Sequence, residues 1–337
     1  MISLDSTVIH KSFGTGKVMK QDNGIITVAF SDCERRFQFP EAFRQYLKFE
    51  DDKLNMSIQN EIKILDDEKQ KALSKPTVPT LSDQTKRAVR KRRGERPNIA
   101  FKCNFCDGGA NRSSIGYNGV CSDEIIYNNI ELEHRTWCST EGCGCMQYMN
   151  GEITRQQLDE MCTDGGFVCY ESQMLREWKA MAGIVQRGDR IGQPMRLNNV
   201  QRNSLCVLTT RDPMSTEEDR YIFAVFLVDD TYGGDEQEEG FVSTRSEYRV
   251  MLSYKEAHKM PFWKYHANGK NRENAVWSQG LHRYMDDTQA MLILHDICEL
   301  KRGTSDEGLA NRFLATFSEI ARIDVDSIGK PNGALTK

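Results

Sequence analysis

The sequence predicts an α+β protein of several domains, and three features of the chain predict it. Short β-rich runs fill the first 48 residues, six of the 11 cysteines fall within residues 103–145, and long apolar runs begin at about residue 204. Helical periodicity appears between and after these segments. With 337 residues and 39% hydrophobic composition, the chain is long enough for two or three domains, each with its own core.

Four segments follow from this pattern. We expect a small β-barrel at 1–48, a helix with a basic linker at 49–97, a cysteine-rich metal-binding module at 98–185, and a mixed β-barrel domain with flanking C-terminal helices at 186–337. Strand-like runs bounded by turn residues, and helix-like runs with 3.6-residue periodicity, define these boundaries.

Charge and hydropathy narrow the class of protein. The net charge is −4, so the whole molecule is not a polycation that binds nucleic acid indiscriminately. No apolar run approaches the roughly 18 residues that a membrane-spanning helix needs. The N-terminus Met1–Asp5 lacks the basic and apolar regions of a signal peptide. We therefore expect a cytoplasmic protein without a membrane partner.

The first segment contains four short β-rich runs, at 7–10, 16–19, 24–30 and 35–39. The turn signal Gln21-Asp22-Asn23-Gly24 predicts a hairpin. Four or five short strands with tight turns are typical of an SH3-like or Tudor-like barrel.

The residues of this segment also resemble a known module. The order His10-x2-Phe13-Gly14-x-Gly16-x-Val18, then Val28-x-Phe30, then Arg36-Phe37-x-Phe39-Pro40-x2-Phe43 is similar to the Tudor-like module at the C-terminus of UvrD-type helicases and in CarD-type transcription regulators. The resemblance implies a barrel that docks a protein partner, such as a polymerase or helicase, or a nucleic acid.

A helix and a basic tract connect the first segment to the cysteines. Apolar residues recur at helical spacing over 50–73, and the sequence Ser74–Thr80 then interrupts the pattern and marks a linker. The basic tract that follows is either a solvated linker or a set of phosphate contacts. Its candidate nucleic-acid-binding residues are Lys86, Arg87, Arg90, Lys91, Arg92 and Arg93.

The cysteine-rich segment predicts a metal site. Glycines stand between the cysteines in Cys106-Asp107-Gly108-Gly109 and in Gly142-Cys143-Gly144-Cys145, and such turns can direct several thiolates to one point. A disulfide framework is the alternative, but it is typical of small secreted domains. The candidate ligands are Cys103, Cys106, Cys121, Cys138, Cys143, Cys145 and Cys169.

Two metal groups fit these cysteines. Zinc is the simplest, bound by the thiolates of Cys103 and Cys106 with two from Cys138, Cys143 and Cys145. The alternative is a [4Fe–4S] cluster, which also takes four thiolates. Its ligand set would be Cys121, Cys138, Cys145 and Cys169.

The C-terminal segment combines buried strands, helices and an aromatic group. Strands are expected at 204–210, 221–228, 241–243 and 248–252, and helices at 286–300 and 309–323. Between them lies a mixture of aromatic and polar residues that can stack on a base and bond its edge, although large aromatics are usually core. These candidates are Trp263, Tyr265, Asn268, Trp277, His282 and Tyr284, with Arg211 from the preceding strand.

This segment resembles PUA-like domains, including their EVE and YTH relatives. The resemblance rests on Gln186-Arg187-Gly188-Asp189-Arg190, on Thr209-Thr210-Arg211 after the first strand, and on the apolar strand that ends Leu227-Val228-Asp229. It implies a curved β-barrel that binds RNA or reads modified bases. The whole chain is also similar to bacterial multidomain proteins that combine a Tudor-like barrel, a cysteine module and a β domain.

No catalytic signature is found: G-x-S-x-G, the P-loop and H-E-x-x-H are all missing from the sequence. The main hypothesis is a non-catalytic nucleic-acid-binding protein with a structural metal site, with DNA favoured over RNA. The first alternative is a nuclease-like DNA-processing enzyme with a zinc or iron–sulfur site. Its acids could be Asp123, Glu124, Glu131 and Glu133, but no lysine follows at the expected place, and charge on a helix face explains them more simply. The second is an interaction adaptor that acts through its N-terminal barrel.

Overall fold

The computed structural model describes residues 4–22, 24–31, 33–74, 97–111, 113–140, 142–185, 189–269, 271–277 and 280–336. The basic tract at 86–93 and the residues 186–188 therefore lie outside the described residues. The chain divides into two compact units, and each is described by itself. Unit 1 comprises 1–95 with 163–166, and unit 2 comprises 96–162 with 167–337.

Unit 1 contains one antiparallel sheet and one long helix. The strand order is β4-β3-β2-β1-β5, and a bulge between Val18 and Lys20 interrupts the pairing of β2 with β3. Val8, Val18 and Phe37 of the sheet are fully buried in one apolar cluster with Ile58 of the helix. The elements are β1 (Thr7–His10), β2 (Gly14–Asp22), β3 (Ile25–Ala29), β4 (Glu34–Gln38), η1 (Glu41–Arg44), β5 (Leu47–Phe49) and α1 (Asp52–Ser74).

The strands and the helix expected in this region are confirmed, but the expected barrel is not. In the described residues the sheet is open, with β4 and β5 as its outer strands. The outer side of β4 pairs instead with a distant piece of chain, through a bridge between Phe37 and Gly166. The same piece approaches β1, where the His10 Nε2 atom lies 3.3 Å from the Asp164 carbonyl oxygen.

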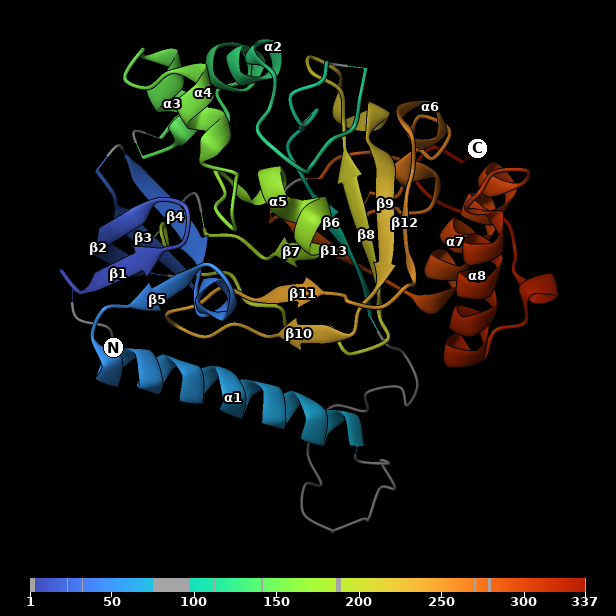
Figure 1. The fold of residues 1–337 in the computed structure, drawn as a ribbon. Helices are drawn as coiled ribbons and strands as arrows, with labels where there is room; N and C mark the ends of the chain where they lie inside the picture. The colour runs from blue at the N-terminus through green and yellow to red at the C-terminus, as the bar shows by residue number, and fades with distance from the viewer. Residues whose placement is uncertain are drawn as a thin grey trace. The chain divides into compact units, whose positions relative to one another are not determined.

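Unit 2 is organised around a five-stranded mixed sheet in the order β12-β9-β8-β6-β13 (Figure 1). Only β6 and β8 run parallel, and all the other neighbours are antiparallel. Every residue of β8 and β9 is buried, as their continuous apolar runs predict. The strands are β6 (Asn98–Lys102), β8 (Leu205–Thr210), β9 (Tyr221–Leu227), β12 (Arg249–Met251) and β13 (His282–Met285).

The cysteine-rich segment is an excursion from this sheet rather than a separate domain. Its first strand, β6, lies between β8 and β13, and its apolar residues share one core with the rest of the unit. The helices α2, α3 and α4 gather above the sheet in Figure 1. The elements are α2 (Asp123–Tyr127), the π-helical turn η2 (Asn128–Leu132), α3 (Gly144–Met149), α4 (Arg155–Glu160), α5 (Tyr170–Glu177) and β7 (Lys179–Met181).

One local expectation in this segment is wrong. The apolar run Phe167-Val168-Cys169-Tyr170 predicts a strand, and the residues from Glu171 to Met181 predict a helix. Instead, Cys169 is the N-cap of α5, and its backbone N–H donates to the Ser172 hydroxyl at 3.2 Å. The helix ends at Trp178, whose left-handed backbone (φ 46°) breaks the helical path before β7.

The remaining elements of unit 2 surround the sheet. The strands β7, β11 and β10 form a second, three-stranded sheet, and α7 packs beside α8 (Figure 1). In the described residues neither sheet closes into the barrel that the sequence predicted. These elements are η3 (Glu217–Asp219), β10 (Asp230–Tyr232), β11 (Phe241–Ser243), α6 (Tyr254–Ala257), η4 (Phe262–Lys264), α7 (Asp287–Lys301), α8 (Glu307–Ala321) and η5 (Val325–Ser327).

The predicted helices at 286–300 and 309–323 are confirmed within two residues by α7 and α8. A capping box begins α7, in which the Asp286 carboxylate accepts from the Gln289 N–H at 2.8 Å. No helix within the described ranges has both the length and the apolar character that crossing a membrane requires.

Candidate metal centre and cation cluster

Five cysteine side chains line one cavity in unit 2. Asn104, Phe105, Ile126, Asn129 and Glu171 complete its wall. The empty space, including its opening to solvent, is about 350 Å³. The five cysteines are Cys121, Cys138, Cys143, Cys145 and Cys169, and together they form what we call the cysteine cavity.

Short helices and turns bring these cysteines together from distant parts of the chain. Cys121 stands just before α2, Cys143 is the N-cap of α3, and Cys169 is the N-cap of α5. The loop between Cys106 and Cys121 folds tightly on itself, because a Cβ on Gly116 would lie 2.2 Å from the Gly108 nitrogen. Only glycine fits at this crossing.

The thiols interact with one another across the cavity. Neighbouring thiols influence each other in two pairs, Cys106 with Cys121 and Cys143 with Cys145. These partners raise the pKa of Cys121 and of Cys145, and burial adds to both shifts. Burial also raises the pKa of Cys138. The raised pKa values hold the thiols of Cys121, Cys138 and Cys145 in the neutral form, although Arg135 opposes the shift at Cys138.

Cys169 and Glu171 line another side of the cavity. Burial raises the pKa of Cys169, and the neighbouring Glu171 carboxylate raises it further. Burial likewise raises the pKa of Glu171, whose Oε1 accepts a hydrogen bond from the Asn104 backbone N–H at 3.2 Å. Glu171 was not predicted from the sequence, since a carboxylate after a cysteine does not by itself indicate a site.

The structure separates the two cysteines of the Cys-x2-Cys pair. Cys106 acts on Cys121, which lines the cavity, whereas Cys103 directly follows β6 and packs its Sγ 3.6 Å from the Met174 Sδ. Cys103 does not line the cavity, although the zinc set requires it. All four cysteines expected for a [4Fe–4S] cluster do line it, including Cys169 from outside the dense cluster.

The donor chemistry of the cavity suits a thiolate-bound metal group. Cys106, Cys121, Cys138, Cys145 and Cys169 are free thiols, so no disulfide involves them. Among the described residues, no three His, Cys, Asp or Glu side chains already have the close arrangement of a single-ion site. The cavity therefore matches a metal group in the type of its side chains and in their shared position around one cavity.

The acids of the nuclease-like alternative are not grouped in this way. Asp123 pairs with Arg155, with 2.8 Å between the carboxylate oxygen and the guanidinium nitrogen. Glu133 pairs with Arg135 and, at 3.5 Å, with Arg211. These acids therefore neutralise arginines rather than converge on one another.

The prediction of an aromatic pocket is wrong, because such a pocket needs an exposed tryptophan ring face. Trp263 and Tyr265 are 0% exposed and Trp277 is 1% exposed, so no tryptophan of this group presents a ring face to solvent. Their rings pack with Phe262 in the core, because apolar surface this large is most stable away from water.

The polar companions of this group also have structural partners. The Asn268 side chain donates to the carbonyl oxygens of Asn274 and Val276, and the Tyr284 hydroxyl accepts from the Asn198 N–H. The His282 ring lies against Phe101, and its buried Nδ1 has no hydrogen-bond partner among the described residues.

Arg211 belongs instead to a group of cations at one end of the five-stranded sheet. Because β6 and β8 are parallel, Lys102 and Arg211 emerge at the same end of the sheet. Arg220 precedes β9, and Arg283 lies in β13, and both strands run antiparallel to these neighbours. The sheet-end cluster comprises Lys102, Arg135, Arg211, Arg220 and Arg283, with the carboxylates of Glu133, Glu217 and Asp219.

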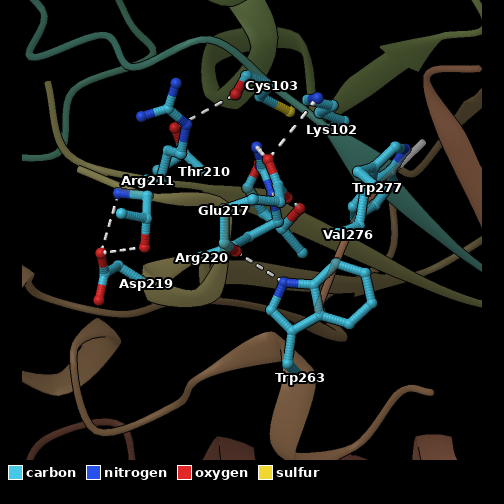
Figure 2. Close-up of polar contacts among 12 residues, drawn as sticks. Lys102, Cys103, Thr210, Arg211, Glu217, Asp219, Arg220, Trp263, Val276 and Trp277 are labelled. Atoms are coloured by element: carbon cyan, nitrogen blue, oxygen red, sulfur yellow. Dashed lines mark hydrogen bonds and ion pairs between the residues drawn. The ribbon is translucent and has the colours of Figure 1, made fainter. Parts of the chain in front are cut away.

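Glu217 and Trp277 hold the buried side of this cluster. Arg220 is 1% exposed, and it donates to both oxygens of Glu217 and to the Thr209 carbonyl oxygen. Its guanidinium lies 5.1 Å from the centre of the Trp277 ring. Figure 2 shows Lys102 reaching toward Glu217, to whose backbone oxygen the Trp263 indole N–H donates.

Among the outer cations, Lys102 has the weakest partner, whereas Arg135 pairs with Glu133 and Arg211 donates to the Ser215 carbonyl oxygen. The Lys102 Nζ atom lies 3.7 Å from the nearest Glu217 oxygen, beyond hydrogen-bond length. Burial lowers the pKa of Lys102, Glu217 opposes this shift, and the neighbouring guanidinium groups add to it. Burial lowers the pKa of Arg211 as well. Of these cations, only Arg211 was predicted from the sequence as a site residue, because a single cation after a strand does not indicate that several cations meet.

The chain was also compared with known proteins. No protein-family description, curated protein or solved structure matches it.

Proposed function

We propose that this protein binds nucleic acid and carries a thiolate-bound metal group, preferably a [4Fe–4S] cluster, in the cysteine cavity. The observation that supports the metal group best is the shared cavity of Cys121, Cys138, Cys145 and Cys169. Four thiolates are the usual ligand set of such a cluster. Zinc remains the alternative group, with its ligands drawn from the same cavity rather than from Cys103.

The metal group would have a structural role. The cavity walls come from the loop before α2, from α3 and from α5, which are short helices with few residues of their own to bury. Short helices are marginal unless tertiary contacts hold them, so a metal that links three of them would stabilise the whole excursion. Cys106 is close enough to Cys121 to act as a further ligand.

Anaerobic purification with elemental analysis tests this proposal. We expect about four irons and four acid-labile sulfides per chain, with the broad visible absorption of a cluster. The double substitution Cys121→Ala and Cys145→Ala should remove the iron. Cys298→Ala is the matched control, because Cys298 is buried in α7 and does not line the cavity.

The outcomes separate the alternatives. One zinc per chain, lost in the double variant, would replace the cluster with zinc. Absence of both metals, with the cavity cysteines oxidised to disulfides, would refute the metal proposal.

The nucleic-acid part of the proposal is supported by positive charge in two places. One is the basic tract of the sequence, and the other is the sheet-end cluster, where five cations face three carboxylates. Cations placed against phosphates release counterions and give salt-sensitive affinity. Retention of labelled DNA and RNA at moderate salt tests it, and failure to retain either would favour the adaptor hypothesis.

A further inference from the structure

We infer that Lys102, Arg135 and Arg211, at the end of the five-stranded sheet, form a binding site for a phosphate group of a nucleic-acid strand. This inference rests on the proposed nucleic-acid binding and names the side chains that contact the backbone. The three cations come from three places in the chain, namely the end of β6, the loop after η2 and the residue after β8.

Topology brings these side chains together. The parallel pairing of β6 with β8 sets Lys102 opposite Thr209, so Arg211 follows two residues later at the same sheet end. The cysteine-rich excursion returns to this point, since Glu133 contacts Arg211 at 3.5 Å and accepts from the Met214 N–H at 3.0 Å. The excursion thereby brings Arg135 to the ends of β6 and β8.

The donors of these cations are not fully used. The Arg135 Nε atom is buried and has no hydrogen-bond partner among the described residues. Within the part of the chain that the structure describes, Lys102 Nζ has only the 3.7 Å contact with Glu217. A buried guanidinium donor without an acceptor is costly, and an oxygen-rich anion would satisfy it.

The charge balance favours an anion over a neutral ligand. Arg220 and Arg283 add two further positive charges to the cluster, and their guanidinium groups lie 5.1 Å and 5.2 Å from the centre of the Trp277 ring. Glu133 and Glu217 offset part of this charge and hold the guanidinium groups in place. Side chains prepositioned in this way lose little conformational freedom when a phosphate binds.

Burial distinguishes this site from an ordinary basic surface. The side chains of Lys102, Arg135 and Arg211 are 29%, 20% and 18% exposed, whereas that of Arg302 is 69% exposed. Partial burial reduces screening by water and salt, so each contact is stronger than at an open surface. The partly exposed atoms are still reachable by a ligand.

The test compares the full-length protein with the double variant Lys102→Gln, Arg211→Gln. Affinity for a labelled 5′-hydroxyl oligonucleotide is measured over a series of salt concentrations. We expect the double variant to bind at least about tenfold more weakly and to reduce the slope of log affinity against log salt by about one to two. Arg302→Gln, an exposed arginine paired with Glu299 in the same unit, is the matched control and should change neither quantity.

Two further variants exclude a merely structural effect. Arg211→Lys keeps the charge and should retain most of the salt slope. Glu133→Gln removes a carboxylate beside Arg135 and Arg211, and we expect it to strengthen binding several-fold. Damage to the fold would weaken binding in every variant, so a gain in Glu133→Gln supports the site.

The source of the phosphate is determined by two additional ligands. A 5′-phosphorylated oligonucleotide that binds much more tightly than the 5′-hydroxyl form would assign the site to a terminal phosphate and overturn the backbone assignment. If the wild-type protein binds no nucleic acid, the proposed function fails. The site itself then stands only if inorganic phosphate raises the melting temperature of the wild type and not of the double variant. Unchanged affinity and salt slope in a folded double variant would overturn the inference.

Discussion

Replacing Trp277 with alanine measures directly whether the C-terminal aromatics are core or ligand-binding. Trp277 is 1% exposed, packs against Phe262 and Trp263, and donates its indole N–H to the Gly280 carbonyl oxygen at 3.0 Å. The guanidinium groups of Arg220 and Arg283 lie beside its ring. The substitution removes all of these contacts at once.

The expected loss of stability follows from these contacts. A buried tryptophan keeps roughly 150–250 Å² away from water, and at about 25 cal/mol per Å² this sets an upper value of about 4–6 kcal/mol. Measured large-to-small substitutions in cores cost about 3–5 kcal/mol. We therefore expect Trp277→Ala to lower the free energy of unfolding of unit 2 by about 4 kcal/mol.

Denaturant unfolding followed by tryptophan fluorescence is a suitable assay. The four tryptophans, Trp137, Trp178, Trp263 and Trp277, all belong to unit 2, so the signal reports this unit alone. Trp277→Phe keeps an aromatic ring and should cost much less than the alanine variant. Trp137→Ala, at a 38% exposed side chain, is the control and should cost less than about 1 kcal/mol.

Affinity measured on the same variants completes the test. Nucleic-acid affinity per folded molecule should be nearly unchanged in Trp277→Ala, since the ring faces the core. A stability close to that of the wild type, together with a ten- to hundredfold loss of affinity, about the effect of one lost stacking contact, would refute the core assignment.

Three further predictions concern pH, a helix cap and the basic tract. Burial raises the pKa of Glu239 to about 7 from an ordinary 4.5. Protonation of Glu239 therefore stabilises the folded state fully below pH 4.5, and this stabilisation is lost as the pH rises through about 7. Glu239→Gln, which can still bond Tyr170 and Gly183, should exceed the wild type in unfolding free energy by up to about 3 kcal/mol at pH 8 and by little at pH 5. An equal difference at both pH values would contradict this. Asp286→Ala removes the N-cap of α7 and should cost about 1 kcal/mol in denaturant unfolding, whereas Asp286→Asn keeps a capping oxygen and should cost less. Alanine at four basic-tract positions should weaken binding similarly across sequences and flatten its salt dependence, and an unchanged slope would make the tract a plain linker. The four positions are Arg90, Lys91, Arg92 and Arg93.

The sequence by itself determined the elements that depend on local pattern. The strands β1 to β4, the helix α1 and the helices α7 and α8 follow from periodicity, turn residues and caps that act over a few neighbouring residues. The α+β class and the position of the cysteine-rich segment follow in the same way. The short elements between Phe167 and Met181 were misplaced because an apolar run of four residues fits a strand or a helix start equally well.

Only the tertiary structure decided which residues meet. Cys103 and Cys106 are three residues apart, yet Cys103 packs against Met174 and Cys106 acts on Cys121 of the cysteine cavity, to which Cys169 comes from a distant helix cap. The aromatics of the C-terminal segment became core because they pack beneath the sheet, which composition does not reveal. Lys102 and Arg211 meet because β6 and β8 pair in parallel across more than a hundred residues of chain. Such pairing depends on which apolar faces bury one another best, and this is a property of the whole fold rather than of any short stretch of sequence.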